Sequence, residues 1–349
     1  MHIPDGYLSP STCGVMFVAA APFWYAAVRR VKRLMHTRFI PLVSLFAAFS
    51  FVIMMFNLPL PGGTTGHAVG MGIAAIVLGP WASLLAISIA LAIQAIFFGD
   101  GGITALGANC FNMAIVGSLV AYAVYRVIAG HTPLTSTRRV VAAGLAGYAA
   151  INASALLAAI EFGLQPLLFK DASGAPLYAP YPLSIAIPAM MIGHLTFAGL
   201  AELIVTGGIV AYLQRSHVSL LRQTAAGAHD AGAGPVPIRV ARSLWAALAL
   251  LLILTPLGIL AVGTAWGEWA PEDFRSGSAR QRMSQASGNV APPTYMPREL
   301  GRLASVWTAP FPRYAPAIVR SARFGYMLSA MLGTGIILFL FVLIGRLLS

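Results

Sequence analysis

The sequence predicts an all-α, polytopic membrane protein, and two observations carry that prediction. Hydrophobic residues make up 58% of the 349 residues and charged residues only 9%, with a mean hydropathy of +0.80. An average soluble domain is about 45 to 50% apolar and about 25% charged. Apolar stretches of about 20 residues, the length that crosses a bilayer as a helix, also recur along the whole chain.

Nine of these stretches are expected to be membrane-spanning helices. In chain order they lie near residues 12–33, 38–57, 68–79, 81–98, 106–129, 139–164, 183–213, 241–263 and 325–348. The third is too short to cross a bilayer straight, and Gly79 and Pro80 separate it from the fourth. These two stretches therefore form either two closely turned spans or one broken, re-entrant element.

The spans group into two parts. Residues 1–215 form a seven-span core, and residues 241–349 form a two-span accessory module with an outer loop at about 264–324. Between them, residues 216–240 are rich in Ala, Gly and Pro, a composition typical of a linker. We expect this linker to be cytoplasmic.

The distribution of Lys and Arg predicts the orientation, because short cytoplasmic loops carry an excess of these residues. The loop after the first span is expected inside because it holds a basic cluster, formed by Arg29, Arg30, Lys32, Arg33 and Arg38. Alternation then places the N-terminus and His67 outside, and leaves Lys170 as the one basic residue of the short outer loops. The arginines of the 264–324 loop are compatible with this orientation, since long translocated loops largely escape the rule.

Several functions are excluded or disfavoured. The formal charge of +12 does not indicate nucleic-acid binding, because most basic residues lie in short loops between apolar stretches. No GxxxxGK[ST] motif is present in a chain whose only lysines are Lys32 and Lys170, so the protein is not itself a P-loop ATPase. An HExxH motif is also absent, and the glycine clusters at 70–72 and 99–102 lack the context of nucleotide loops. Cys13 and Cys110 are expected to be packing residues rather than a disulfide framework.

The first residues, MHIPDGYLSP, suggest a metal chelate. This start lacks the basic-then-apolar order of a signal peptide, so we expect the N-terminus to be retained. A free Met-His terminus offers the Met1 amine, the His2 amide and the His2 imidazole, three nitrogens whose chelate rings lie in one plane. Planar nitrogen ligation suits Ni²⁺ or Cu²⁺ better than tetrahedral Zn²⁺. His67 is the expected fourth ligand and Asp5 a nearby hydrogen-bonding or charged group. The alternative is that a histidine in second position arises by chance.

The chain resembles the CbiM/NikM family, the substrate-specific membrane components of energy-coupling factor (ECF) transporters for cobalt and nickel. The resemblance covers about residues 1–215 and rests on MHIPDGYLSP, GGTTGHAVG (62–70), GGITALGANCFNM (101–113), EFGLQP (161–166) and MIGHLTFAGLAELIVT (191–206). It implies a divalent-metal site made by the amino-terminal nitrogens and a histidine of a second loop, which here are Met1, His2 and His67. The Ile-Pro-Asp-Gly form of the start looks more like the nickel branch of the family.

The C-terminal module resembles the small companion subunit (CbiN/NikN) of the same transporters, here fused to the core. The stretch TPLGILAVGTAWGEWAPEDF (255–274) carries this looser similarity, although the usual Pro-Asp-Gly-Leu-Glu element is not present as such. The resemblance also implies partners: a scaffold transmembrane subunit and cytoplasmic ATPases.

Other polar residues in the spans are candidate supporting groups. Asn109 and Asn112 are three apart on one helical face, and they either hold the amino-terminal segment or simply join helices by hydrogen bonds. His194 and Glu202 lie in the seventh span, where an ionisable residue is a functional candidate by default. Structural hydrogen bonding is the favoured role for Glu202. Glu161, at the outer rim of the sixth span, is expected to cap that helix or to favour cation entry.

Together these features predict uptake of a divalent transition metal, nickel rather than cobalt, across the cytoplasmic membrane of a bacterium. The chain would be the substrate-binding subunit of an ATP-driven transporter, neither an enzyme nor the carrier of a permanent cofactor. One alternative is a secondary transporter that exchanges a cation for protons through Glu202 and His194. Another is a membrane metal sensor.

Overall fold

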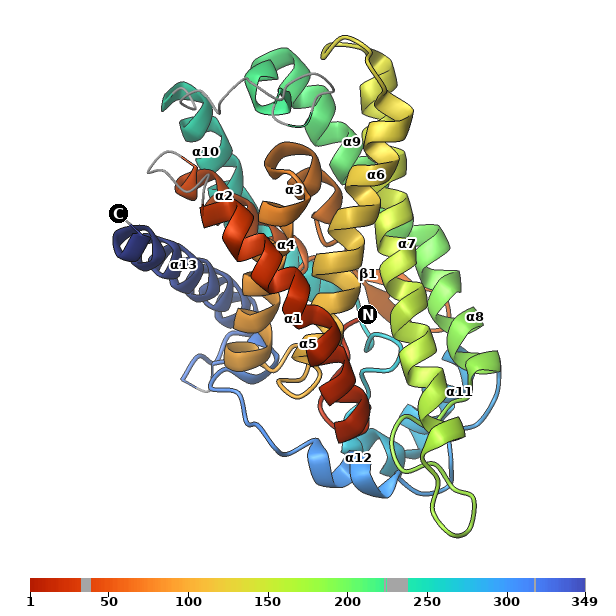
Figure 1. The fold of residues 1–349 in the computed structure, drawn as a ribbon. Coiled ribbons are helices and arrows are strands. Elements are labelled where there is room, and N and C mark those ends of the chain that lie inside the picture. Colours follow the sequence, from red (N-terminus) through yellow and green to blue (C-terminus); the bar gives the residue numbers. More distant parts are fainter. Residues whose placement is uncertain (33–38, 223, 225–237, 317, 349) are drawn as a thin grey trace.

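The computed structural model describes residues 1–32, 39–222, 224, 238–316 and 318–348. Most of the predicted linker at 216–240 lies outside these described residues. Within them the chain is a bundle of long helices with a smaller layer of short helices at one end, as Figure 1 shows. The prediction of a mostly helical membrane protein is confirmed.

Seven helical rods in the described part of the chain are long and apolar enough to cross a membrane. Three of them contain a π-helical turn, and one ends in a 3₁₀ turn. The rods are α1 (Pro10–Lys32); α4 (Pro80–Ile93) with η1 (Gln94–Phe98); α5 (Leu106–Asn109) with η2 (Cys110–Val116) and α6 (Gly117–Ala129); α7 (Thr137–Leu168); α8 (Leu183–Gly193) with η3 (His194–Ala198) and α9 (Gly199–Ser216); α10 (Ile238–Leu254) with η5 (Thr255–Leu260); and α13 (Ala322–Leu348).

The other two stretches predicted as spans are shorter helices. They are α2 (Ile40–Ile53) and α3 (Met71–Leu78), and every residue of α3 is buried. Helix α3 packs against α4, α6, α7 and α9 inside the bundle. The predicted break after it is present, because Gly79 ends α3 at φ +80° and Pro80 occupies the first turn of α4.

One small feature departs from the all-α prediction. Strands β1 (Leu58–Leu60) and β2 (Thr64–Gly66) pair antiparallel and lead directly into His67. Gly62 and Gly63 between them take positive φ values of 80° and 74°, which lets the chain reverse in a short turn. Three-residue strands are too short to produce an alternating pattern, so the sequence did not predict this hairpin.

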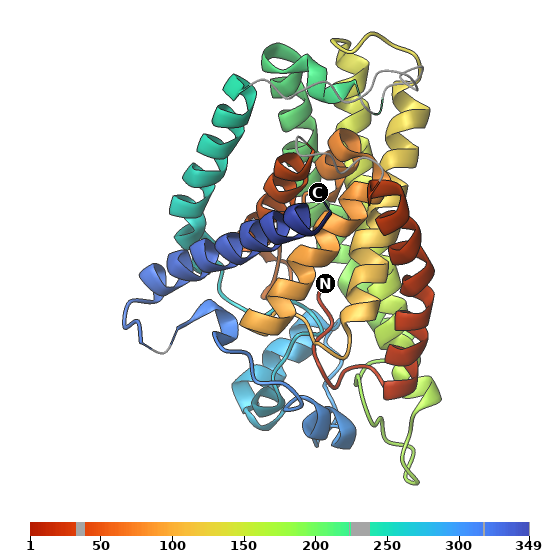
Figure 2. The ribbon, with the colours of Figure 1, turned by 60° about the vertical axis from the view of Figure 1, so that its left-hand side comes forward.

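The part of the C-terminal module between α10 and α13 covers one end of the bundle and contacts the amino-terminal arm. Between α10 and α13 the chain forms the short helices η6 (Pro271–Arg275), α11 (Gly277–Ala286), α12 (Arg298–Leu303) and η7 (Pro312–Tyr314). Figures 1 and 2 show these segments below the N-terminus, while α13 runs beside α2. Two backbone hydrogen bonds join this part of the module to the core. Phe311 N donates to Phe97 O at 2.9 Å, and Leu300 N donates to Leu177 O at 3.1 Å.

Candidate metal centre

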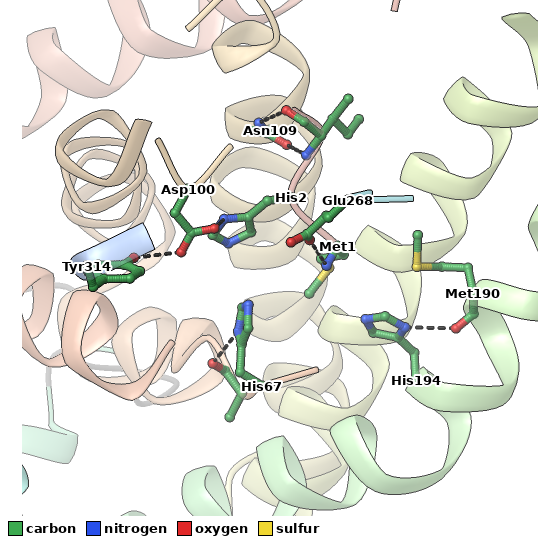
Figure 3. Close-up of polar contacts among 11 residues, drawn as sticks. Met1, His2, His67, Asp100, Asn109, Met190, His194, Glu268 and Tyr314 are labelled. Atoms are coloured by element: carbon green, nitrogen blue, oxygen red, sulfur yellow. Dashed lines mark hydrogen bonds and ion pairs between the residues drawn. The ribbon is translucent and has the colours of Figure 1, made fainter. Parts of the chain in front are cut away.

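The chain enters the bundle as an extended arm, residues 1–9, that turns back into α1. Met1, His2 and His67 are buried with exposed fractions of 4%, 1% and 7%, and the rings of His2 and His67 lie 5.1 Å apart. Figure 3 shows the Met1 terminus and the His2 ring of the arm beside the ring of His67, which comes from a second segment. The three residues predicted to share a site therefore lie together.

The segment 101–109 holds the arm in place. The Asn109 side chain forms two hydrogen bonds with the backbone of Ile3. Its Oδ1 accepts from Ile3 N at 2.8 Å, and its Nδ2 donates to Ile3 O at 3.0 Å. Asp5 accepts the backbone N–H groups of Ile103 and Thr104 and the Thr104 hydroxyl. Two of the predicted supporting residues, Asn109 and Asp5, thus fix the position of the arm.

Glu202 anchors the segment that carries His67. Its carboxylate accepts backbone N–H groups from Val69 at 2.8 Å, Gly70 at 2.9 Å and Gly72 at 3.2 Å, at the N-terminus of α3. A carboxylate at a helix N-terminus satisfies donors that the helix cannot satisfy itself and also opposes the helix dipole. His67 Nδ1 faces the carbonyl oxygen of Ala68 at 3.1 Å, which favours a proton on Nδ1 and leaves Nε2 as the free lone pair. Glu202 therefore forms structural hydrogen bonds, and its partners are backbone groups of the segment that carries His67.

Two carboxylates that the sequence analysis missed lie against the arm. Asp100 Oδ1 is 2.7 Å from His2 Nδ1, and Glu268 Oε1 from the C-terminal module is 3.2 Å from the Met1 amine. Asp100 is thus the partner of His2 Nδ1, whereas no hydrogen-bond partner of the buried His2 Nε2 lies among the described residues. A buried nitrogen without a partner is unusual and suits a site that a cation fills. Asp100 belongs to the glycine cluster at 99–102, which the sequence analysis considered only as a nucleotide loop and discarded.

The electrostatics of the two histidines differ. Burial acts to lower the pKa of His2, but the negative charges of Asp100 and Glu268 outweigh it and raise the pKa above the ordinary 6.5. Burial, followed by the charges of His2 and the terminal amine, lowers the pKa of His67 to about 3. Burial opposes ionisation of Asp100, yet the His2 charge and its hydrogen bonds keep the Asp100 pKa below its ordinary value. His67 is therefore a neutral nitrogen donor, whereas His2 is held as the positive partner of a carboxylate.

The remaining predicted residues lie around this centre without joining it. Asn112 donates to Glu161 Oε2 at 2.9 Å, so it joins two helices instead of holding the arm with Asn109. His194 Nδ1 faces the Met190 carbonyl oxygen at 2.8 Å, and Figure 3 shows its ring beside Met1. Cys13 and Cys110 are buried and unpaired, as predicted.

Side chains alone do not make a metal site in the described residues, where no three His, Cys, Asp or Glu side chains are grouped closely enough to hold an ion. Any metal bound between His2 and His67 would need further donors from the main chain. The nearest are the Met1 amine and the His2 amide, as the chelate hypothesis requires. A bundle of membrane-length helices that brings these buried nitrogens together defines a multi-pass membrane protein with a candidate site for a divalent transition metal.

The chain belongs to the family described as the cobalt uptake substrate-specific transmembrane region, whose pattern matches residues 2–220. Residues 241–349 match a second family, described as the PDGLE domain. The predicted resemblance to the CbiM/NikM family, with a fused companion module, is confirmed. The first family consists of membrane transport components and not of enzymes, also as predicted.

Curated relatives extend over nearly the whole chain. The fused nickel transport protein NikMN of Rhodobacter capsulatus is 60% identical over 337 residues, which cover 97% of this chain and 95% of that protein. The probable fused nickel transport protein LarMN of Lactiplantibacillus plantarum is 43% identical over 352 residues, covering 99% and 97%. A crystal structure described as a truncated transition metal transporter is 50% identical with a TM-score of 0.58, and the match covers 62% of this chain and 100% of that one.

Proposed function

We propose that this chain captures Ni²⁺ in preference to Co²⁺ outside the cytoplasmic membrane of a bacterium, as the substrate-binding subunit of an ATP-driven ECF transporter. The observation that carries the proposal is the buried convergence of His2, His67 and the Met1 amine. Membership of a cobalt-uptake family and the nickel-transport relatives support the choice of substrate.

Four nitrogens would bind the metal: the Met1 amine, the His2 amide, His2 Nδ1 and His67 Nε2. His2 Nδ1 would exchange its contact with Asp100 for the metal. The first three belong to consecutive groups of one chain and favour a planar arrangement, which suits Ni²⁺. With a neutral amine, two neutral imidazoles and a deprotonated amide, the complex keeps one net positive charge. A buried charge needs a partner, and Asp100 and Glu268 lie close enough to supply the balancing negative charge.

We place nine crossings of the bilayer in this function, with α2 and α3 as the short ones and the N-terminus outside. Residues 1–215 are the metal-binding core, 216–240 the cytoplasmic linker and 241–349 the accessory module. A scaffold transmembrane subunit and cytoplasmic ATPases are the proposed partners, because this chain has no P-loop of its own. No permanently bound cofactor takes part.

The secondary-transporter alternative gains no support from Glu202. Both of its oxygens already accept backbone N–H groups, so the side chain serves as an anchor rather than as a free proton carrier. No contact in the described residues favours the sensor alternative.

The test is nickel binding by the full chain with its native terminus, measured by metal analysis and by competition with a chelator. We expect His2→Ala and a variant with one extra residue ahead of Met1 to lose bound nickel, since both destroy the terminal chelate. His131→Ala is the matched control, because His131 is an exposed histidine in the turn between α6 and α7. Full nickel occupancy in the extended variant would show that the terminal amine is not a ligand.

A further inference from the structure

Tyr314 of the C-terminal module reaches the metal centre from the loop that covers the core. Its hydroxyl donates to Asp100 Oδ2 at 2.6 Å, while Asp100 Oδ1 lies 2.7 Å from His2 Nδ1. Figure 3 shows Tyr314, Asp100 and His2 in line. The two oxygens of one carboxylate thus connect the accessory module to the amino-terminal arm.

The Tyr314 side chain is fixed by its surroundings. Its ring is 7% exposed and stacks on Phe98 at 4.8 Å between centroids, with 19° between the planes. Gln94 Nε2 donates to the hydroxyl oxygen at 3.1 Å, so the hydroxyl has a donor of its own and directs its proton to Asp100. The side chain therefore has one defined hydrogen-bonding direction.

The backbone at this point is strained. Arg313 and Tyr314 have φ values of 54° and 58°, the left-handed region that residues other than glycine avoid. Such a conformation costs about 1 to 3 kcal/mol for each residue and persists only where surrounding contacts hold it. Ser329 Oγ, about two turns into α13, donates to Tyr314 O at 3.0 Å and helps to hold this backbone in place. The backbone is thus strained at the turn that directs the Tyr314 side chain toward Asp100.

The contact to Asp100 matters because of where Asp100 lies. Asp100 comes two residues after Phe98, the last residue of η1. Gly99 between them has φ +64°, so the chain turns away from that helix before it reaches Asp100. The structure gives the Asp100 side chain two partners, His2 and Tyr314. Without the Tyr314 hydroxyl, the carboxylate could rotate away from the His2 ring.

We propose that Tyr314 is a positioning residue of the metal centre, which holds the Asp100 carboxylate beside His2 through the hydrogen bond from its hydroxyl. When nickel takes His2 Nδ1, the carboxylate held in this place balances the positive charge of the complex. The inference rests on the proposed metal centre of Met1, His2 and His67. It assigns the accessory module a part in the site itself, because the core supplies the carboxylate and the module fixes its direction.

The experiment compares Tyr314→Phe with Tyr326→Phe in the full chain. Both changes remove only a hydroxyl from the same aromatic cluster, where the Tyr326 hydroxyl donates to Met55 O at 2.8 Å and the two rings lie 5.4 Å apart. Competition against a chelator measures the affinity for Ni²⁺. We expect Y314F to bind nickel about tenfold more weakly, which corresponds to about 1.4 kcal/mol, with Y326F within about twofold of the parent. The unfolding temperature of each variant checks that the fold is kept.

A double-mutant cycle with Asp100→Asn separates positioning from general packing. If Tyr314 acts through Asp100, Y314F produces no further loss in the D100N background, and the visible absorption of bound nickel changes alike in both single variants. Unchanged affinity in Y314F, an equal loss in Y326F, or additive losses in the double variant would each overturn the inference. The variant extended ahead of Met1 belongs in the same series. If it binds nickel fully, the metal centre itself is wrong; if it fails while Y314F binds normally, only the role of Tyr314 is wrong.

Discussion

The two halves of the candidate metal centre are held by different kinds of contact. The His67 half is anchored through main-chain N–H groups that point at Glu202, deep between α3 and α9. In the half made by Met1 and His2, Asn109 and Asp5 fix the arm, but the amine and the imidazole themselves face the carboxylates of Glu268 and Asp100. One of these carboxylates, Glu268, comes from the accessory module.

This difference suggests a division of labour. His67 is neutral, and nothing in its half has to change charge when a metal arrives. The amino-terminal half must give up protons before its nitrogens can bind a metal, since a protonated amine or imidazole has no free lone pair. The half that contains His67 therefore keeps its protonation state when a metal binds, and we call it the fixed half. The half made by Met1 and His2 exchanges protons for the metal, and we call it the proton-exchanging half.

The largest expected effect comes from removing the anchor of the fixed half. Glu202→Ala leaves three buried N–H groups of the His67 segment without an acceptor. An unsatisfied buried donor costs about 1 to 3 kcal/mol, so we expect the free energy of unfolding to fall by about 3 kcal/mol. Loss of a group that orients a ligand also weakens metal binding, here by about a hundredfold. Thermal unfolding and nickel competition measure the two effects.

Thr206→Val is the matched control for the anchor. The Thr206 hydroxyl makes only a long contact of 3.4 Å with Glu202 Oε1, and valine keeps the shape of the side chain. We expect nickel affinity within about threefold of the parent, as for the loss of one weak hydrogen bond. If E202A kept parental affinity, the claim that Glu202 sets the position of His67 would fail.

The same contrast separates what the sequence predicts from what it does not. Long apolar stretches, the Gly79-Pro80 break and the shared side of His2 and His67 follow from composition, local chain geometry and the basic loops. These signals lie within one segment or in the alternation of segments. Chelate chemistry and the family resemblance then join Met1, His2 and His67 into one hypothesis, and both can be derived from the sequence alone.

The carboxylates of the proton-exchanging half were missed for a physical reason. Glu268 is separated from Met1 by 267 positions, and its contact depends on how the loop between α10 and α13 folds over the core. Tyr314 reaches Asp100 only because of a strained turn that no local motif predicts. Asn112 was grouped with Asn109 by helical spacing, yet its amide turns to Glu161. Spacing identifies a shared face, but the partner on that face depends on tertiary packing.

The second prediction concerns pH and tests which half limits metal binding. The pKa of His2 is raised above 6.5, so a proton on His2 competes with nickel at a pH higher than an ordinary histidine would give. His67, with its pKa lowered to about 3, does not compete in that range. Nickel affinity should therefore fall by about tenfold for each pH unit and each displaced proton as the pH drops below the raised His2 pKa. Calorimetric titrations between about pH 5 and pH 8.5 measure it. An affinity that stays constant down to pH 5 would contradict this assignment.

The smallest expected effect isolates the module's own carboxylate. Glu268→Gln removes a negative charge that helps to raise the pKa of His2, so the His2 pKa falls and the acid limit of nickel binding moves to lower pH. The same change removes part of the charge that balances the bound metal, so affinity at high pH, where protons no longer compete, should fall slightly. Glu272→Gln is the control, because Glu272 lies four residues further along the same loop and is not among the charges that act on His2. An equal shift in both variants would indicate only a change in overall charge at this face. A shift confined to E268Q would show that the module adjusts the proton-exchanging half while leaving the fixed half alone.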